Sequence, residues 1–115
     1  MNDQSKPVFL SDCPARLVME ILADKWAPLV LYGLGQQPRR HGELIDLVGG
    51  ISRKVLTETL RRLQGYGLVE RLENPPRLIV YRLTNLGHTL IEPIEMLNDW
   101  ASEHAGAITE LSAAS

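Results

Sequence analysis

Residues 50–67 of this 115-residue chain read GISRKVLTETLRRLQGYG. Ser52 suits a helix N-cap, because its hydroxyl can accept a hydrogen bond from a first-turn N–H group. The apolar face consists of three leucines at helical spacing, Leu56, Leu60 and Leu63. Gly65 and Gly67 favour the end of a helix. The stretch therefore predicts one short amphipathic helix.

The other side of this helix carries cations and hydroxyls. These residues lie mostly off the leucine face: Arg53, Lys54, Thr57, Arg61 and Arg62. A short helix of this kind can enter the major groove of DNA and touch both phosphates and base edges. A surface helix with solvated charges has the same pattern, so the neighbouring segments have to distinguish the two interpretations.

The preceding segment predicts a helix-turn-helix. Residues 39–48 form a short amphipathic pattern, and Gly49-Gly50 supplies a tight turn into the basic helix. Arg40 stands at the start of this supporting helix, beside Arg39 and His41. A helix N-terminus is positively polarised, which favours binding of a phosphate there.

The following segment predicts a β-hairpin. Residues 68–72 and 78–83 are strand-like, and Asn74-Pro75-Pro76 between them is typical of a turn. Three arginines are distributed along it, at positions 71, 77 and 82. An ordinary hairpin has solvated arginines too, but its position directly after a helix-turn-helix favours a DNA-binding wing.

The remaining segments complete one mainly α domain over residues 1–115. We expect an N-terminal arm over 1–12 and core helices over 13–37, the first beginning at Cys13-Pro14 and the second near Asp24, which can cap it. The helix-turn-helix then spans 39–67 and the wing 68–83.

A last helix is predicted over 84–112, with Thr84 as its cap. Apolar positions recur at steps of four and three, and Trp100 lies beside them: Leu90, Ile94, Leu97, Ala101, His104, Ile108 and Leu111. Pro93 predicts a bend or a late start. Such a seam on an acidic tail favours dimerisation with a second copy, and the alternative is a helix folded back over its own core.

Charge is unevenly distributed, although the net charge is only −2. Residues 39–82 contain nine basic and five acidic side chains, whereas the segment after Arg82 contains five acidic side chains and no Lys or Arg. One surface therefore attracts phosphate while another repels it.

Composition argues against several other classes. One cysteine excludes an internal disulfide, and Cys and His spacing predicts no metal site. No Ser/His/Asp, paired-carboxylate or phosphate-loop pattern indicates an enzyme, and no cofactor is expected. With neither a membrane-length apolar run nor a signal-peptide core, the expected location is the cytoplasm.

The ordered motifs resemble the HxlR-type winged helix-turn-helix transcriptional regulators, which are similar in fold to the MarR group. The resemblance covers Cys13 to about Trp100 through these motifs: Cys13-Pro14, Lys25-Trp26, Arg40-x-x-Glu43-Leu44, Gly50-Ile51-Ser52, Leu56-Thr57-x-x-Leu60-Arg61-x-Leu63, Gly67-Leu68-Val69-x-Arg71, Tyr81-x-Leu83-Thr84-x-x-Gly87 and Trp100. It implies a homodimer, paired through N- and C-terminal helices, that binds double-stranded DNA at a palindromic operator.

The sequence departs from the family pattern at three places. Ala23-Asp24 stands where Gly-Gly usually precedes Lys-Trp, and His41 stands where an aromatic residue usually follows the arginine. The wing is about two residues shorter than usual. A shorter wing changes how deeply it can reach into a minor groove.

From the exposed side of the basic helix we predict base-edge contacts for Arg53, Thr57 and Arg61. Phosphate contacts are predicted for Ser52, Lys54, Arg62 and Arg77, and Arg40 is a further DNA-binding candidate.

Control by thiol chemistry is a separate hypothesis. The resemblance implies a sensing cysteine in some members, here Cys13, and a thiol at a helix start near Arg16 is expected to ionise more readily. An unreactive, structural cysteine is the alternative. Mass spectrometry after diamide treatment, with a Cys13→Ser control, distinguishes the two.

A different class also fits the sequence: a small-molecule-binding or protein-interaction module of winged-helix fold that does not bind DNA. A small-molecule effector would then bind in a pocket between the core and the tail helices, lined by Trp26, Tyr32, Tyr66 and Trp100, whereas an electrophile would react with Cys13. Such aromatic residues are more often part of a core.

Overall fold

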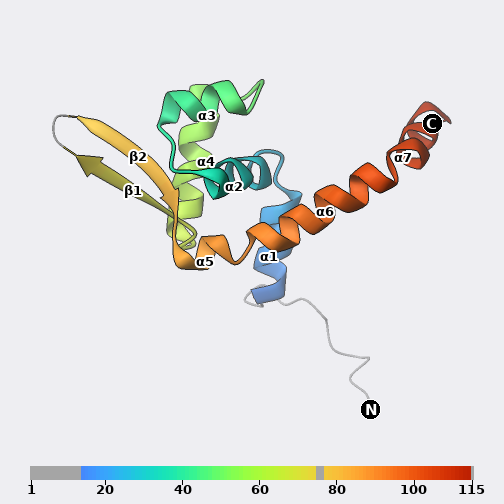
Figure 1. The fold of residues 1–115 in the computed structure, drawn as a ribbon, viewed down its shortest axis with the longest axis horizontal. Helices are drawn as coiled ribbons and strands as arrows, with labels where there is room; N and C mark the ends of the chain where they lie inside the picture. Colours follow the sequence, from blue (N-terminus) through green and yellow to red (C-terminus); the bar gives the residue numbers. More distant parts are fainter. Residues whose placement is uncertain (1–13, 75–76, 115) are drawn as a thin grey trace, which may run out of the picture.

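The computed structural model describes residues 14–74 and 77–114 and has the winged helix-turn-helix fold, so the predicted fold class is confirmed (Figure 1). The helices are α1 (Pro14–Ala23), α2 (Ala27–Gln36), α3 (His41–Leu47), α4 (Arg53–Gly65), α5 (Asn85–His88), α6 (Ile91–Glu103) and α7 (Ala105–Ala114). The strands are β1 (Val69–Asn74) and β2 (Leu78–Leu83). The predicted N-terminal arm, Cys13 and the prolines of the predicted turn, Pro75 and Pro76, lie outside the described residues.

Helix α2 is the centre of the core. Val30 and Leu31 are completely buried, and Leu34 nearly so. The N-cap is Trp26 and not Asp24 as predicted, but Asp24 Oδ1 accepts hydrogen bonds at the start of the helix from the N–H groups of Trp26 at 2.8 Å and Ala27 at 3.0 Å. The apolar character of this segment is explained by its position, since neighbours cover it on several sides.

Helix α4 packs its leucine face on this core. Leu56, Leu60 and Leu63 are each at most 1% exposed. Ser52 is the N-cap, and its Oγ accepts a hydrogen bond from Val55 N–H at 3.1 Å. The left-handed backbone of Gly67, at φ 78°, turns the chain from the helix into β1. The buried face is therefore the one that the leucine spacing predicts.

The expected start of the third helix needs a correction. Residues 39 and 40 are not helical, because Arg39 forms a two-hydrogen-bond bridge with Tyr81 of β2, with N–O distances of 2.9 and 2.8 Å. Helix α3 therefore begins at His41. The bridge joins the segment before α3 to the antiparallel hairpin, in which Val69 pairs with Leu83 and Asn74 with Leu78.

The single helix expected over 84–112 is also wrong, since this segment forms three helices. Thr84 caps the short α5, accepting from Gly87 N–H at 3.0 Å. Helix α6 starts at Ile91, so Pro93 falls in its first turn, where its missing N–H group costs little. A second break lies at His104, whose φ of −110° and ψ of 14° leave the helical range.

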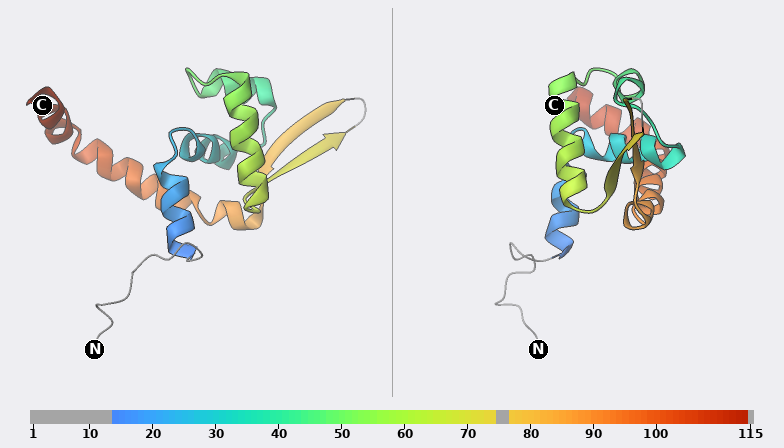
Figure 2. Two further views of the ribbon diagram at one scale, coloured as in Figure 1. Left: turned by 180° about the vertical axis from the view of Figure 1, so that it is seen from behind. Right: turned by 90° about the vertical axis from the view of Figure 1, so that its left-hand side faces the viewer.

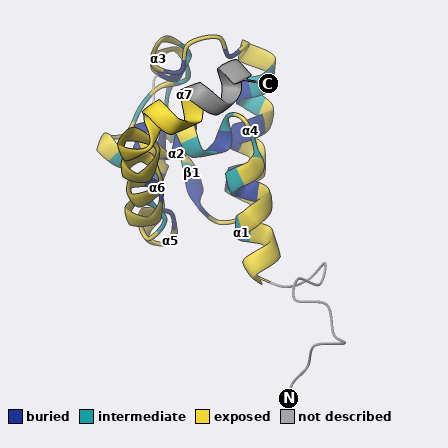
Figure 3. Cartoon of the chain, turned by 90° about the vertical axis from the view of Figure 1, so that its right-hand side faces the viewer, coloured by how far each residue is buried: buried dark blue, intermediate teal, exposed yellow. Residues whose placement is uncertain are grey.

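The tail projects away from the body of the protein. Figures 1 and 2 show α6 and α7 extending from one side and the hairpin from the other. Along the predicted seam Ile94 is buried in the core of the chain, whereas Leu97, Trp100 and Ile108 are 52%, 54% and 41% exposed. Figure 3 shows α6 and the first part of α7 exposed over nearly their whole surface.

Candidate nucleic-acid interface

The outward face of α4 is the centre of the candidate site. Lys54, Glu58 and Arg61 are exposed and lie opposite the buried leucines, as helical spacing of 3.6 residues requires. Arg53 and Thr57 lie on the flank toward α3, and Arg62 lies on the flank toward the turn between α1 and α2. The structure thus presents the predicted base-contacting residues on one side of one helix.

A hydrogen bond between His41 and Thr57 joins the two helices of the helix-turn-helix. The Thr57 hydroxyl donates to the Arg53 carbonyl at 2.9 Å, so its oxygen accepts from His41 Nε2, 3.0 Å away. We therefore assign the proton of neutral His41 to Nε2, which leaves Nδ1 as an acceptor. Thr57 is held in place by this contact, so its side chain is pre-oriented at the flank of the outward face.

Burial of the imidazole and then the positive charge of Arg53 hold the pKa of His41 below its ordinary value of 6.5. The unfolded chain therefore binds more protons than the folded chain between the folded-state pKa and about pH 6.5. Stability is fully present above this window and falls as the pH drops through it.

We expect a His41→Gln variant to lose this dependence. The wild-type free energy of unfolding should fall between pH 7 and the folded-state pKa by less than about 1 kcal/mol, since the ring is partly exposed and screened. Urea denaturation at a series of pH values measures the slope. An identical slope in both proteins would rule out His41 as its source.

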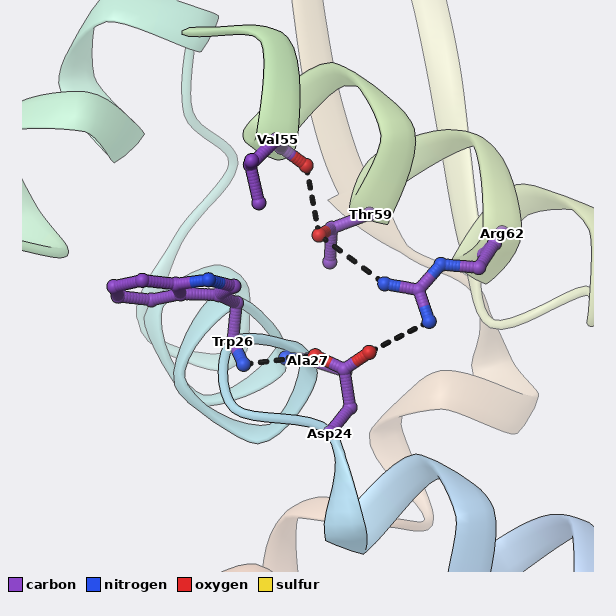
Figure 4. Close-up of polar contacts among 6 residues, drawn as sticks. All are labelled: Asp24, Trp26, Ala27, Val55, Thr59 and Arg62. Carbon is purple, nitrogen blue, oxygen red and sulfur yellow. Dashed lines mark hydrogen bonds and ion pairs between the residues drawn. The ribbon is translucent and has the colours of Figure 1, made fainter. Parts of the chain in front are cut away.

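Arg62 differs from the other cations of α4 because its guanidinium is engaged within the chain. Its Nη1 lies 2.6 Å from Asp24 Oδ2, and its Nη2 lies 3.4 Å from Thr59 Oγ1 (Figure 4). Arg53, Lys54 and Arg61 take part in none of the ion pairs between described side chains. This pairing competes with the phosphate contact predicted for Arg62.

The hairpin arginines also divide into two kinds. Arg71 lies 3.3 Å from Glu73 and Arg82 2.9 Å from Glu70, so each has an acidic partner on the same hairpin. Arg77 is the turn residue directly before β2, is exposed and has a left-handed backbone with φ 64°. It takes no part in the ion pairs of the described residues, which leaves its charge available at the wing tip.

The start of α3 holds the last candidate, Arg40. Its side chain is exposed, while its N–H donates to Glu43 Oε1 at 2.7 Å. Arg39 is a structural residue, because its Nε donates to the Gly33 carbonyl at 2.9 Å and its Nη2 to Gln36 Oε1 at 2.7 Å. Ser52, between the two helices, caps α4 with its hydroxyl.

Sequence reasoning missed Glu58 as part of this surface. It is an exposed carboxylate in the middle of the cationic face, between Lys54 and Arg61. The helical spacing of these three residues was the signal that could have found it. An acidic side chain there repels phosphate and can accept a hydrogen bond from a cytosine amino group.

The aromatic residues considered for an effector pocket are not gathered at one place. An apolar pocket of about 290 Å³ lies between α2 and α6 and is lined by Leu22, Pro28, Leu29, Tyr32, Ile94, Leu97 and Asn98. Of the four aromatic candidates it includes Tyr32. Tyr66 lines another hollow, and the Trp100 ring stacks on His104 with 4.7 Å between ring centroids.

The fold is that of a helix-turn-helix transcriptional regulator. The sequence profile of the HxlR-like helix-turn-helix family matches residues 21–109, and the chain belongs to this family. Its relatives are transcriptional regulators, a class of protein distinct from enzymes.

Two relatives illustrate the similarity. The uncharacterized HTH-type transcriptional regulator YtfH of Escherichia coli is 33% identical over 95 residues, which cover 81% of this chain and 75% of the relative. The solved structure of YtfH from Salmonella typhimurium has a TM-score of 0.79 at 28% identity and covers 93% of this chain and 97% of the other.

A third relative has been solved in several chemical states. The reduced form of the transcriptional regulator YodB from Bacillus subtilis has a TM-score of 0.72 at 30% identity, covering 79% of this chain and 92% of the other. Diamide-treated and quinone-bound forms of YodB are similar to this chain as well.

Membrane-spanning helices and clusters of metal ligands are both absent from the part of the chain that the structure describes. Within residues 14–74 and 77–114, no helix is long and apolar enough to cross a bilayer. The same part of the chain contains no group of three or more His, Cys, Asp or Glu side chains placed to hold a metal ion.

Proposed function

We propose that this regulator binds a two-fold operator as a homodimer, with α4 of each copy in a major groove. The observation that carries the proposal is the outward face of α4, where Arg53, Lys54 and Arg61 are exposed and take no part in ion pairs between described residues. In a symmetric dimer the two helices would read half-sites about 34 Å apart.

The residues divide by the chemistry they can offer. Arg53 and Arg61 can each donate two hydrogen bonds to a guanine edge, and Thr57 can contact a base margin. Ser52, Lys54 and Arg40 lie where the groove walls would meet the helix ends, and Arg77 extends this surface to the wing tip. Phosphate contacts position the protein, whereas base contacts specify the sequence.

Substitutions of Arg61 and Arg77 test this division. We expect Arg61→Ala to weaken binding to a selected operator by about 1–3 kcal/mol and to relax the preference at one base position. Arg77→Ala should weaken binding to all DNA sequences alike. The salt slope, which is the slope of the logarithm of the binding constant against the logarithm of the salt concentration, should become shallower by about 0.9 per lost phosphate contact. Fluorescence anisotropy with operator and random duplexes, over a series of salt concentrations, measures both effects.

Arg82→Ala is the matched control for Arg77, because Arg82 is paired with Glu70 on the same hairpin. It should leave the salt slope close to that of the wild type. A wild-type protein with a flat salt dependence, or with no affinity for any duplex, would contradict DNA binding and favour the alternative of an effector-binding or protein-interaction module.

The dimer is supported by the exposed seam on the tail. Leu97, Trp100 and Ile108 form an apolar surface that the rest of the chain leaves uncovered, and α6 and α7 extend beyond the body (Figures 1 and 3). A second copy can bury this surface, at about 25 cal/mol per Å² of apolar area. Ala101 and His104 belong to the same stretch and are exposed.

Thiol control of Cys13 stays a sequence prediction. Its support is the similarity to YodB, which is known in reduced, diamide-treated and quinone-bound forms. The diamide experiment with Cys13→Ser tests whether this chain shares that chemistry.

A further inference from the structure

Asp24 uses both of its carboxylate oxygens, and they act on different helices (Figure 4). Oδ1 accepts the N–H groups of Trp26 and Ala27 at the start of α2, at 2.8 and 3.0 Å. Oδ2 lies 2.6 Å from Arg62 Nη1 on α4. The Asp24 side chain is 14% exposed, so this ion pair is partly shielded from water.

The same contact continues into the backbone of α4. Arg62 Nη2 lies 3.4 Å from Thr59 Oγ1, and the buried Thr59 hydroxyl donates to the Val55 carbonyl at 2.8 Å. A connected set of hydrogen bonds therefore joins the first turn of α2 to two turns of the DNA-facing helix. Such a connection fixes how α4 is rotated and tilted relative to the core.

The pairing also changes the charge that α4 offers to DNA. Arg62 is about 100° around the helix from Arg61, at the flank of the outward face. Side chains on the flanks of a helix in a groove meet the groove walls, where the phosphates lie. The Arg62 side chain is 51% exposed, so without Asp24 it would be free to turn toward such a phosphate.

We propose that Asp24 is a specificity-determining residue that holds Arg62 away from the DNA backbone while it positions α4. This inference rests on the proposed function. Phosphate attraction is independent of sequence, so each cation withheld from phosphate lowers non-specific binding. Withholding the cation lowers operator binding by the same amount, so the increase in the ratio of specific to non-specific affinity comes from the fixed orientation of α4, which keeps Arg53 and Arg61 aligned for base contacts.

The carboxylate remains charged under the conditions where DNA binding takes place. Burial acts to raise the pKa of Asp24, but the N–H groups of Trp26 and Ala27 and the Arg62 guanidinium together hold that pKa below its ordinary value. The ion pair is therefore intact throughout the neutral range and is lost as the pH falls through the folded-state pKa.

The test separates the charge of Asp24 from its hydrogen bonds at the start of α2. The Asn side chain also carries an acceptor oxygen, so Asp24→Asn keeps an acceptor for the N–H groups at the start of α2 and removes the charge that holds Arg62. Binding of the full-length protein to its selected operator and to a random-sequence duplex is measured over a salt series. The variants are Asp24→Asn, Arg62→Gln, the double variant and Asp99→Asn.

We expect Asp24→Asn to bind the random duplex about 3–10-fold more tightly at low salt, with a slope steeper by about 0.9 for each protomer bound. Operator affinity should rise less, because α4 is no longer held in its orientation for base contacts, so the ratio of specific to non-specific affinity falls. The double variant should behave as Arg62→Gln. Asp99, exposed on α6, controls for the change in net charge, and its variant should leave the slope near the wild-type value.

The Arg62→Gln variant tests the proposal even if Asp24→Asn folds poorly, which circular dichroism would show. Because Arg62 is withheld from phosphate in the wild type, its loss should leave the random-duplex slope unchanged. A slope reduced by about 0.9 per protomer would overturn the proposal. The proposal would also be overturned if Asp24→Asn and Asp99→Asn had the same affinity and salt slope on the random duplex, or if the double variant kept the gain in random-duplex affinity. Absence of all DNA binding by the wild type would instead overturn the proposed function.

Discussion

Replacing Gly87 with alanine is expected to destabilise the fold by about 3 kcal/mol or more, the upper end of the cost of overpacking. A methyl group at this position would overlap the Leu68 carbonyl oxygen and lie 3.3 Å from Leu83 Cβ. The first neighbour is backbone, so it has no rotamer by which to move aside. Helix α5 would have to shift away from the start of β1.

That shift would break a junction with several hydrogen bonds. The Leu68 carbonyl accepts from Thr84 N–H at 3.0 Å, and the Thr84 hydroxyl donates to the Gly67 carbonyl at 2.6 Å. Gly87 N–H in turn donates to Thr84 Oγ1 at 3.0 Å. The alanine therefore disturbs the base of the wing and the start of the tail together.

Thermal and urea unfolding measure the effect. A loss of 3 kcal/mol corresponds to a fall in Tm of roughly 10–15 °C for a domain of this size. Gly42→Ala is the matched control, because an added Cβ there meets nothing within 4 Å and the residue is helical. It should be neutral or stabilising by about 0.5–1 kcal/mol. Equal stability of the two variants would contradict the close approach at Gly87.

Local patterns predicted the elements that this junction connects. The leucine spacing in residues 50–67 indicates which face of α4 is buried, and Ser52 marks its first turn, because both signals act within a few residues. The strand-like runs around Asn74 likewise predict the hairpin. Assembly of these elements as a winged helix-turn-helix followed from their order along the chain.

Contacts between distant residues were beyond reach of such patterns. Asp24 is recognisable from its neighbours as a hydrogen-bond acceptor near the start of α2, but its ion pair with Arg62 depends on how α2 and α4 cross. The Arg39–Tyr81 bridge, which delays the start of α3, likewise joins segments far apart in the chain. Neither the residues near Arg39 nor those near Arg62 carry a local signal for these partners.

The tail shows a different limit of the sequence. Its apolar seam is periodic from residue 90 to 108, yet the structure divides it between two environments. Ile94 packs into the core of the chain, while Leu97 and Trp100 remain half exposed on α6. Periodicity indicates that a face requires cover, but it does not say which chain provides it.

The second large effect is expected from charges placed on the uncovered part of this seam. A Leu97→Glu, Trp100→Glu double variant should be monomeric, because burying two carboxylates in an apolar interface is strongly unfavourable. The fold should survive, since both side chains are already more than 50% exposed within one chain. Analytical ultracentrifugation at micromolar concentration measures the oligomeric state, and circular dichroism checks the helical content.

Loss of the dimer should carry over to DNA. In a dimer, binding of the first α4 raises the effective concentration of the second at its half-site, so separation of the two costs about 10²–10⁴-fold in operator affinity. Binding to a single half-site should be little changed, because α4 and the wing are far from the substitutions. Ser102→Glu is the control: Ser102 is exposed on the same helix but lies about 140° around from Leu97 and about 160° from Trp100 by helical spacing. If the double variant sediments as a dimer, the seam is not the dimer interface. If the double variant is monomeric and keeps full operator affinity, the proposal of a two-fold operator is wrong and each protomer binds DNA alone.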